Sequence, residues 1–143
     1  MELVKLSKIL GGERVLHKRL KTQLDLIELS NRGIPKIALN HLMMYMNWSI
    51  GMTASLLPIT ERTIQRYSEE DCFNSVVSEQ ILQISQVIAR GLEVFEDKEK
   101  FLSWMNHPNS AIANKTPFEL MSSKFGSEMI LDELGRIEHG IIS

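Results

Sequence analysis

Arginine, glutamine and threonine side chains recur over residues 60–66 at a spacing that could read DNA. A threonine before a helix can accept a hydrogen bond from an amide of the first turn, so Thr60 predicts a helix start. If Ile64 then faces inward, Arg62 and Arg66 lie on the opposite side, at about 100° per residue. In a major groove, arginine can pair with guanine and glutamine with adenine. The predicted DNA-binding residues are Thr60, Arg62, Thr63, Gln65 and Arg66.

The residues before this segment fit a helix-turn-helix motif. Ser49 predicts the start of a helix that ends near residue 57, because a residue that precedes proline disfavours helical geometry. The motif needs a small residue where its helices approach, a tight turn about four residues later, and buried apolar residues in the second helix. These positions hold Ala54, Leu57, Pro58, Ile59, Ile64 and Tyr67. Such turns often carry glycine where Pro58 stands, so we expect an opened or shifted turn. An ordinary surface helix would show the same outward polar side chains. The spacing of the small and apolar residues from Ala54 to Tyr67 favours DNA binding instead.

Periodic apolar residues predict helices along the whole chain, and therefore an all-α fold. A helix over residues 13–31 is expected after Gly11-Gly12, and a second helix is expected from Pro35 to about residue 47. The buried stripe of the first would be Leu16, Leu20, Leu24 and Ile27. The clearest amphipathic pattern runs from residue 76 to about 98. It lacks regular flanking charge pairs, so packing on a domain core is favoured over a dimerising coiled coil.

The C-terminal segment carries a strong helix-start signal at Thr116-Pro117-Phe118-Glu119. Threonine can cap this helix, proline suits its first position, and glutamate at the third position completes a capping box. The helix is expected to end at Gly126, and Ser127 is expected to cap the last helix. The apolar residues of that last helix are Ile130, Leu134 and Ile137.

Charge is distributed unevenly between the two halves of the chain. Residues 1–67 contain ten Lys or Arg and five Asp or Glu, a net charge of +5; residues 68–143 contain six and thirteen, a net charge of −7. A basic half suits a polyanion, whereas an acidic half suits a basic protein surface. We predict an N-terminal helical segment at 1–32, a helix-turn-helix domain at 33–95 and a separate domain at 96–143.

Several function classes find little support in the composition. No apolar run is long enough for a signal peptide or a membrane span, so the expected location is the cytoplasm. Cys72 stands alone, which fits a reducing compartment. The four histidines lack metal-ligand spacing, and no phosphate-binding glycine loop or nucleophile context is present. We therefore expect neither an enzyme nor a metal or cofactor.

A set of motifs occurs in a fixed order along nearly the whole chain: Asp25-Leu26-Ile27-Glu28-Leu29 with Gly33-Ile34-Pro35, Thr60-Glu61-Arg62-Thr63 with Gln65-Arg66, Trp104, Pro108-Asn109, Thr116-Pro117-Phe118-Glu119-Leu120 and Arg136-Ile137-Glu138-His139-Gly140. Together they resemble the Xre-type antitoxins of bacterial RES-Xre toxin-antitoxin pairs. The motifs after residue 100 are the most specific. One departure is Ile112-Ala113-Asn114, where the family usually has Leu-Gly-Gly, and it predicts a stiffer loop before Thr116.

The resemblance implies an all-helical homodimer with an Xre-like helix-turn-helix domain and a toxin-binding domain at 96–143. Such a protein would neutralise a RES-domain toxin, an NAD-degrading enzyme, and bind operator DNA to repress its own operon. The resemblance also implies that the C-terminal region blocks the toxin's active site. The predicted toxin-binding residues are Arg136, Glu138, His139, Gly140, Ile141, Ile142 and Ser143.

The chemistry of the C-terminal tail leaves two arrangements open. A pocket that binds the pyrophosphate of NAD is expected to be basic, so an acidic domain with a terminal carboxylate at Ser143 could compete for it. Alternatively, Ile141 and Ile142 fold back on the last helix. A stand-alone helix-turn-helix repressor with a different effector or partner is the alternative function, and it would share the first half of the chain.

Overall fold

The computed structural model describes residues 2–140, which form ten α-helices and one 3₁₀ helix and contain no strand. The all-α prediction is confirmed. The helices are α1 (Glu2–Ile9), α2 (Glu13–Leu16), α3 (Gln23–Arg32), α4 (Lys36–Met46), α5 (Ile50–Leu56), α6 (Glu61–Arg66), α7 (Ser75–Phe95), α8 (Lys98–Met105), η1 (Ser110–Ile112), α9 (Pro117–Leu120) and α10 (Lys124–Glu138). Among the described residues, no helix is both long and apolar enough to cross a membrane.

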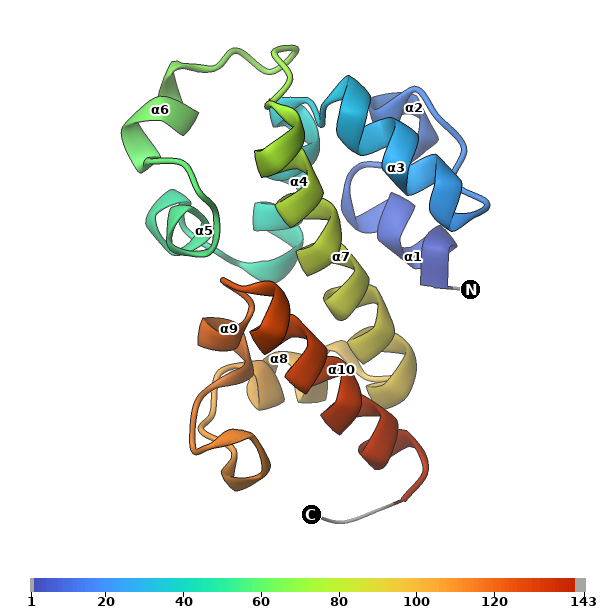
Figure 1. Cartoon of the computed structure of the whole chain (residues 1–143), viewed down its shortest axis with the longest axis vertical. Helices are drawn as coiled ribbons and strands as arrows, with labels where there is room; N and C mark the ends of the chain where they lie inside the picture. The colour runs from blue at the N-terminus through green and yellow to red at the C-terminus, as the bar shows by residue number, and fades with distance from the viewer. Residues whose placement is uncertain (1, 141–143) are drawn as a thin grey trace. The chain divides into compact units, whose positions relative to one another are not determined.

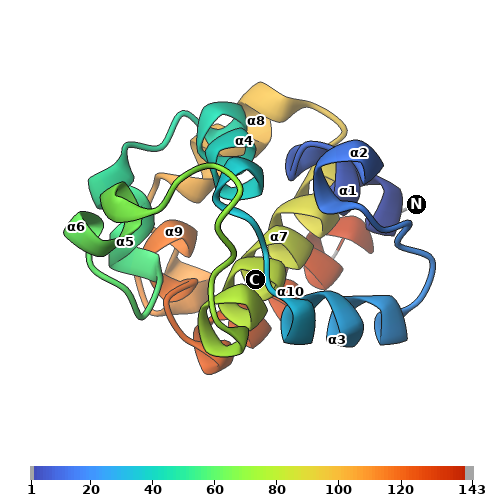
Figure 2. The ribbon, with the colours of Figure 1, turned by 90° about the horizontal axis from the view of Figure 1, so that it is seen from above.

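The chain divides into two compact units, residues 1–86 and residues 87–143, and the boundary falls inside α7. In the first unit, α1 to α3 lie on one side of α4 and of the first half of α7, and α5 and α6 lie on the other (Figure 1). The view from above shows the same order (Figure 2). The core of this unit includes Ile34, Leu39, Leu42, Ile64 and Ile81, each at most 1% exposed. The three-part division at residues 32 and 95 stays a prediction.

The expected helix over residues 13–31 is wrong, because the chain forms α2 and α3 with a bend between them. His17 adopts a left-handed conformation (φ 52°) that ends α2. Thr22 then starts α3, and the Asp25 carboxylate accepts hydrogen bonds from the amides of Thr22 (2.9 Å) and Lys21 (2.7 Å). These amides lower the pKa of Asp25. The Arg32 guanidinium donates to the carbonyls of Leu16 and His17, which supplies partners at the end of α2.

Two members of the predicted buried stripe are consequently exposed. Leu16 and Leu20 are buried, whereas Leu24 is 60% exposed and Ile27 57% exposed. The new start at Thr22 changes the helical phase, so that Leu26 and Leu29 turn inward instead. An apolar pattern that is continued across a helix break therefore predicts the wrong buried residues for the second helix.

The expectations for α4, α5 and α7 are confirmed within one to three residues at their ends. Gly33 ends α3 at φ 104°, and the Ser49 hydroxyl accepts a hydrogen bond from the Met52 amide at the start of α5 (3.1 Å). Helix α5 ends before Pro58, and Leu57 has the extended geometry (φ −120°, ψ 152°) that a following proline favours.

In the second unit, α8 begins at Lys98, and its aromatic side chains pack on the end of α7. The Asp97 carboxylate accepts a hydrogen bond from the Lys100 amide (3.2 Å), so part of the charged run at residues 96–100 is helical. Phe101 is fully buried, and its ring lies 5.9 Å from that of Phe95 and 6.4 Å from that of Trp104. Phe95 and Trp104 are partly buried and cover the fully buried ring of Phe101.

The start of α10 is a second correction. Gly126 does not end α9 and Ser127 does not cap α10, because α9 already ends at Leu120 and the Ser123 hydroxyl caps α10 by accepting from the Gly126 amide (3.0 Å). Gly126 lies inside the helix, where a Cβ would stand only 1.8 Å from the Leu120 carbonyl oxygen. The glycine therefore permits close packing of α10 on α9, and Ser127 is buried within the helix.

Candidate functional sites

Helix α6 has the start and the two faces that its sequence predicts. The Thr60 hydroxyl accepts a hydrogen bond from the Thr63 amide at 3.1 Å, and the two hydroxyls are 2.8 Å apart. Ile64 is completely buried. On the other side Arg62, Gln65 and Arg66 are exposed, as the helical spacing requires. This helix can thus present one glutamine and two arginines to a ligand while a single isoleucine anchors it.

Helix α5 packs against α6 across the four-residue turn at residues 57–60, which is the arrangement of a helix-turn-helix. The Glu61 carboxylate is exposed and extends toward α5: its Oε2 lies 3.4 Å from the position that a Cβ on Gly51 would take. The sequence analysis assigns no role to Glu61, which adds a negative charge to the first turn of α6, next to Arg62 in the chain. An acidic group there can accept a hydrogen bond from cytosine and would repel a phosphate.

The segment that follows α6 returns to the start of α4, and its contacts there hold the C-terminal end of α6 in place. The Tyr67 ring stacks on Phe73 with 4.7 Å between ring centres, and the Lys36 ammonium donates to the Tyr67 carbonyl at 2.8 Å. The backbone amides of Lys36 and Phe73 pair with the carbonyls of Asp71 and Ile34, at 2.8 and 2.9 Å. Nothing in the sequence signalled the hydrogen bonds of Lys36 and Ile34, because they join residues that are 31 to 39 positions apart.

The capping box predicted at Thr116 is present. The Thr116 hydroxyl accepts from the Glu119 amide at 3.2 Å, and the Glu119 carboxylate accepts from the Thr116 amide at 3.0 Å. The loop before it holds Ala113 and Asn114 in left-handed conformations, with φ of 62° and 60°. These are the positions where the sequence departs from Leu-Gly-Gly, and glycine would adopt this geometry without steric cost.

The end of α10 carries the predicted toxin-binding residues that the structure describes. Arg136, Glu138, His139 and Gly140 are all exposed. The Arg136 guanidinium donates to the carboxylate of buried Glu133 at 2.9 Å. Ile141, Ile142 and Ser143 lie outside the described residues.

Glu138 forms a paired interaction with Arg90 at the start of the second unit. The two guanidinium nitrogens of Arg90 lie 2.9 and 2.5 Å from the two carboxylate oxygens of Glu138. This pairing lowers the pKa of Glu138. It also ties the last turn of α10 to α7, a connection between residues 48 apart that the sequence did not indicate. The neighbouring His139 ring lies 3.9 Å from the same carboxylate.

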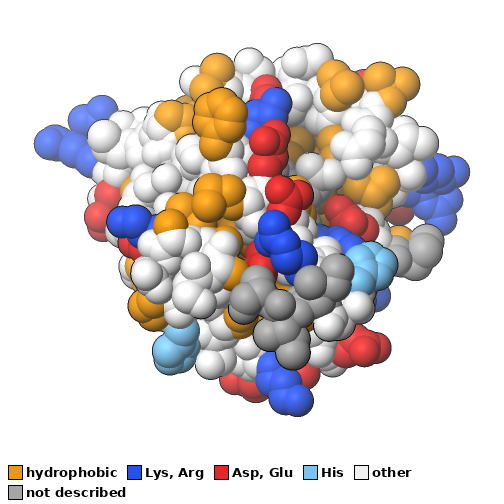
Figure 3. Space-filling model, turned by 60° about the horizontal axis from the view of Figure 1, so that its bottom comes forward, with side chains coloured by type: hydrophobic (Ala, Val, Ile, Leu, Met, Phe, Trp, Pro, Cys, Tyr) orange, Lys and Arg blue, Asp and Glu red, His pale blue; other side chains and the backbone are white. Residues whose placement is uncertain are grey.

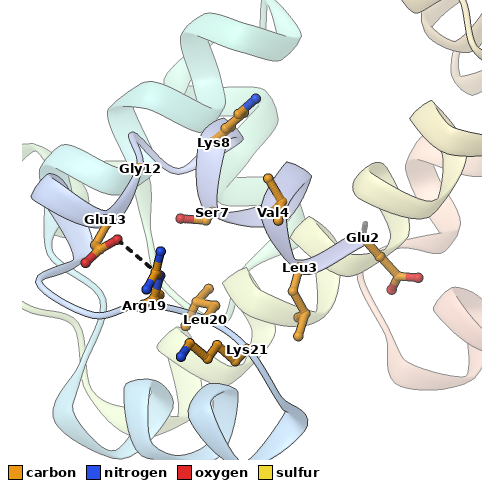
Figure 4. A pocket seen from close by; sticks show the side chains of 10 residues that line it. All are labelled: Glu2, Leu3, Val4, Ser7, Lys8, Gly12, Glu13, Arg19, Leu20 and Lys21. Atoms are coloured by element: carbon orange, nitrogen blue, oxygen red, sulfur yellow. Dashed lines mark ion pairs between the residues drawn. The ribbon is translucent and has the colours of Figure 1, made fainter.

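A pocket of about 920 Å³ lies in the first unit, between α1 and the bend that follows α2 (Figure 4). Leu3, Val4 and Leu20 give it an apolar part, and basic side chains stand nearby. One of them, Arg19, is paired only loosely with Glu13, at 3.9 Å. The sequence could not indicate this pocket, because the bend that forms one side of it was expected to be helical.

The described residues contain no group of three or more His, Cys, Asp or Glu side chains that could hold a metal ion. One face of the molecule shows acidic and basic side chains next to one another, with small groups of hydrophobic side chains between them (Figure 3). This face therefore offers charged side chains of both signs and scattered apolar groups.

Similar known proteins indicate the family that this chain resembles. Residues 90–140 match the family described as the antitoxin Xre/MbcA/ParS C-terminal toxin-binding domain. A protein named Antitoxin Xre from Photorhabdus laumondii subsp. laumondii is 28% identical over 118 residues, which cover 79% of this chain and 78% of that protein. The resemblance to Xre-type antitoxins is confirmed.

A second relative and a solved structure are also similar to this chain. A protein named Antitoxin Xre from Yersinia enterocolitica is 29% identical over 80 residues, or 55% of this chain and 54% of that protein. The fold is similar to that of a chain in the crystal structure of the M. tuberculosis MbcT-MbcA toxin-antitoxin complex, with a TM-score of 0.56. That similarity covers 87% of this chain and 100% of the other at 10% identity, so it concerns the fold alone.

Proposed function

We propose that this antitoxin binds a RES-domain, NAD-degrading toxin through its C-terminal region, blocks the toxin's active site, and represses its own operon by binding DNA through α6. The observation that carries the proposal is the match of residues 90–140 to a toxin-binding domain family. The exposed Arg62, Gln65 and Arg66 on a capped α6 support the DNA-binding part. A homodimer within a larger toxin-antitoxin complex belongs to the same proposal.

The physical basis of inhibition is competition for a basic pocket. Residues 87–143 contain six Lys or Arg and nine Asp or Glu, a net charge of −3. An enzyme that binds the pyrophosphate of NAD needs positive charge at its site, and an acidic domain is attracted to such a site. Arg136, Glu138, His139, Gly140, Ile141, Ile142 and Ser143 are proposed to contact the toxin.

Copurification with the product of the adjacent reading frame tests the toxin-binding part. The toxin should consume NAD when it is assayed alone and should lose this activity when the antitoxin is added. Removal of residues 140–143 should restore NAD consumption while the complex still forms through the rest of the domain. A shortened chain that still inhibits fully would contradict active-site blocking by the tail.

A gel-shift titration with DNA from the promoter upstream of this gene tests the repression part. Binding should weaken steeply with added salt, because cations are released from the phosphates that basic side chains neutralise. Arg62→Ala should weaken it, whereas Lys115→Ala, which removes an exposed lysine from the second unit, should not. Equal effects of the two changes would argue against a role for α6.

A stand-alone repressor with a different effector remains the second candidate, and the pocket beside α1 is the observation that favours it (Figure 4). It lies in the same unit as α6 and is large enough for a small molecule. A RES-type reading frame next to this gene would favour the antitoxin, and its absence would favour the repressor.

A further inference from the structure

The positive charge of the basic half is concentrated in its first 21 residues. Residues 1–21 contain six Lys or Arg and two Asp or Glu, a net charge of +4; residues 22–67 contain four and three, a net charge of +1. Within the first unit, α1 and α2 lie on the opposite side of α4 from α6 (Figure 1). The DNA contacts that we propose for α6 therefore do not account for most of this charge.

The basic segment surrounds the pocket of about 920 Å³ beside α1, which has an apolar wall. Helix α1 contributes Leu3 and Val4 to this wall, and the bend after α2 contributes Leu20 (Figure 4). Val4 is 44% exposed, so a hydrocarbon group that enters the pocket would remove it from water. The volume is in the range of cavities that hold small organic molecules. This wall favours a ligand with an apolar body.

The polar side of the pocket has basic groups that an anion can reach. Arg19 lies 3.9 Å from Glu13, and their side chains are 71% and 63% exposed. Such an exposed pair contributes little stability, so a ligand carboxylate can replace Glu13 as the partner of Arg19. Lys21 follows in the same non-helical stretch, and among the described residues its ammonium has no ion-pair partner. The Ser7 hydroxyl can donate a further hydrogen bond.

The charges of the lining have a net value of +1, from three basic side chains and two acidic ones: Lys8, Arg19 and Lys21 against Glu2 and Glu13. The Glu2 carboxylate extends away from Arg19, which leaves the basic groups of the bend closer to a ligand in the pocket (Figure 4). The pocket therefore combines an apolar wall with an excess of positive charge.

We infer that this pocket binds a small amphipathic anion, a carboxylate with an aliphatic body. The carboxylate pairs with Arg19 and Lys21, and the aliphatic body lies against Leu3, Val4 and Leu20. A nucleic-acid phosphate would use the basic groups and leave the apolar wall in water, whereas an amine with the same body would meet a net positive lining. The inference goes beyond the proposed function, because the site requires neither a toxin nor DNA.

The test titrates the full ¹⁵N-labelled chain with octanoate, below its critical micelle concentration and at constant pH and ionic strength, and records amide NMR signals. The signals of Ser7, Gly12 and Leu20 should shift and saturate, whereas those of Gly126 and Gly135 in the second unit should not move. Hexanoate lacks two methylene groups and should bind about four- to tenfold more weakly. Acetate and octylammonium, which keep only the charge or only the apolar body, should each bind at least about fivefold more weakly than octanoate.

A charge reversal at the rim tests the polar side. Arg19→Glu leaves two basic and three acidic side chains in the lining, a net charge of −1. It should weaken octanoate binding by about tenfold and strengthen octylammonium binding. The matched control Arg14→Glu reverses an exposed arginine of α2 that does not line the pocket, and it should change the dissociation constant of octanoate by less than about twofold. Thermal unfolding of each variant establishes that it is folded.

Four results would overturn the inference. Octanoate might leave the signals of the pocket unshifted in the folded parent chain, which would mean that the pocket does not bind this class of ligand. Equal affinities for octanoate and octylammonium would indicate an apolar hollow without preference for charge, and equal affinities for octanoate and acetate would indicate a bare anion site. Equal weakening by Arg19→Glu and Arg14→Glu would indicate general attraction to a basic segment. None of these results bears on binding of the toxin.

Discussion

Two glycines in the same helix should respond in opposite directions to replacement by alanine. Gly126 lies where α10 packs on α9, and a Cβ there would stand 1.8 Å from the Leu120 carbonyl oxygen. Gly135 lies in open space nine residues later. Both replacements add one methyl group to α10, in its first turn at Gly126 and in its last turn at Gly135, so the pair separates the cost of packing from the gain in helix propensity.

The expected magnitudes follow from these two environments. The atoms at Gly126 must separate by at least about 1.2 Å to reach 3.0 Å, and because the obstacle is backbone it cannot rotate away. Overpacking of this kind costs about 3 kcal/mol, and improved propensity offsets about 1 kcal/mol, so Gly126→Ala should destabilise by about 2 kcal/mol. Gly135→Ala gains the propensity alone and should stabilise by about 0.5–1 kcal/mol.

Urea unfolding followed by circular dichroism measures both variants against the parent chain at the same protein concentration. The two units can unfold in separate transitions, so the midpoint that belongs to residues 87–143 is the one to compare. A difference of about 3 kcal/mol between the two alanine variants is expected. Gly126→Ala within about 0.5 kcal/mol of the parent would refute the close approach of α9 and α10.

Three further predictions concern other parts of the chain. Arg66→Ala should weaken operator binding by about 1–3 kcal/mol and relax base preference if the arginine pairs with a base; a loss that is uniform across sequences in the same gel-shift assay would mark a phosphate contact. Ala113→Gly should stabilise by up to about 1 kcal/mol in urea unfolding, because φ is 62°, whereas Ala111→Gly should not stabilise. The Arg90–Glu138 pair should stabilise the fold at pH values above the ordinary pKa of a glutamate. This stabilisation should be lost as the pH falls through the lowered pKa of Glu138, because protonation removes the negative charge that Arg90 binds. Glu138→Gln should abolish this acid sensitivity in unfolding measured from pH 7 to pH 3, and an unchanged pH profile would argue against the pair.

Local signals predicted the start of most helices correctly. Ser49, Thr60 and Thr116 each accept the amide hydrogen bond that their sequence context indicates. Such bonds join residues three apart, so the information lies within one turn of helix. The exposed arginines of α6 follow from the same local geometry once Ile64 is buried.

The two wrong helix predictions, over residues 13–31 and at the start of α10, lie where two local signals compete. Thr22 and Asp25 form a capping box, but the apolar repeat across residues 13–31 concealed the break at His17. At α10 the sequence indicates a helix stop at Gly126 and a cap at Ser127, whereas the cap is Ser123, four residues before Ser127, and Gly126 is required by packing. A glycine that ends a helix and a glycine that lets two backbones approach look alike in sequence, and only the position of Leu120 distinguishes them.

The contacts that position the predicted sites were beyond local reasoning. The Arg90–Glu138 pair and the hydrogen bond from the Lys36 ammonium to the Tyr67 carbonyl depend on how separate helices and loops meet. Arginine and glutamate are common throughout the chain, so no spacing rule could select these two. The sequence indicated which residues stand at the end of α10, but it did not show that one of them is already engaged by α7.

The passage of α7 from one unit into the other constrains how such a protein can diversify by recombination. A lineage that acquired a new first unit would have to join it within a continuous helix, since the boundary lies between Gln86 and Val87. Each residue gained or lost at the junction rotates everything beyond it by about 100° and shifts it by about 1.5 Å. Exchanges that keep the helical phase are therefore the ones we expect to survive, so a change in the DNA contacts that we propose for α6 should arise more readily by substitution on α6 than by replacement of the whole unit.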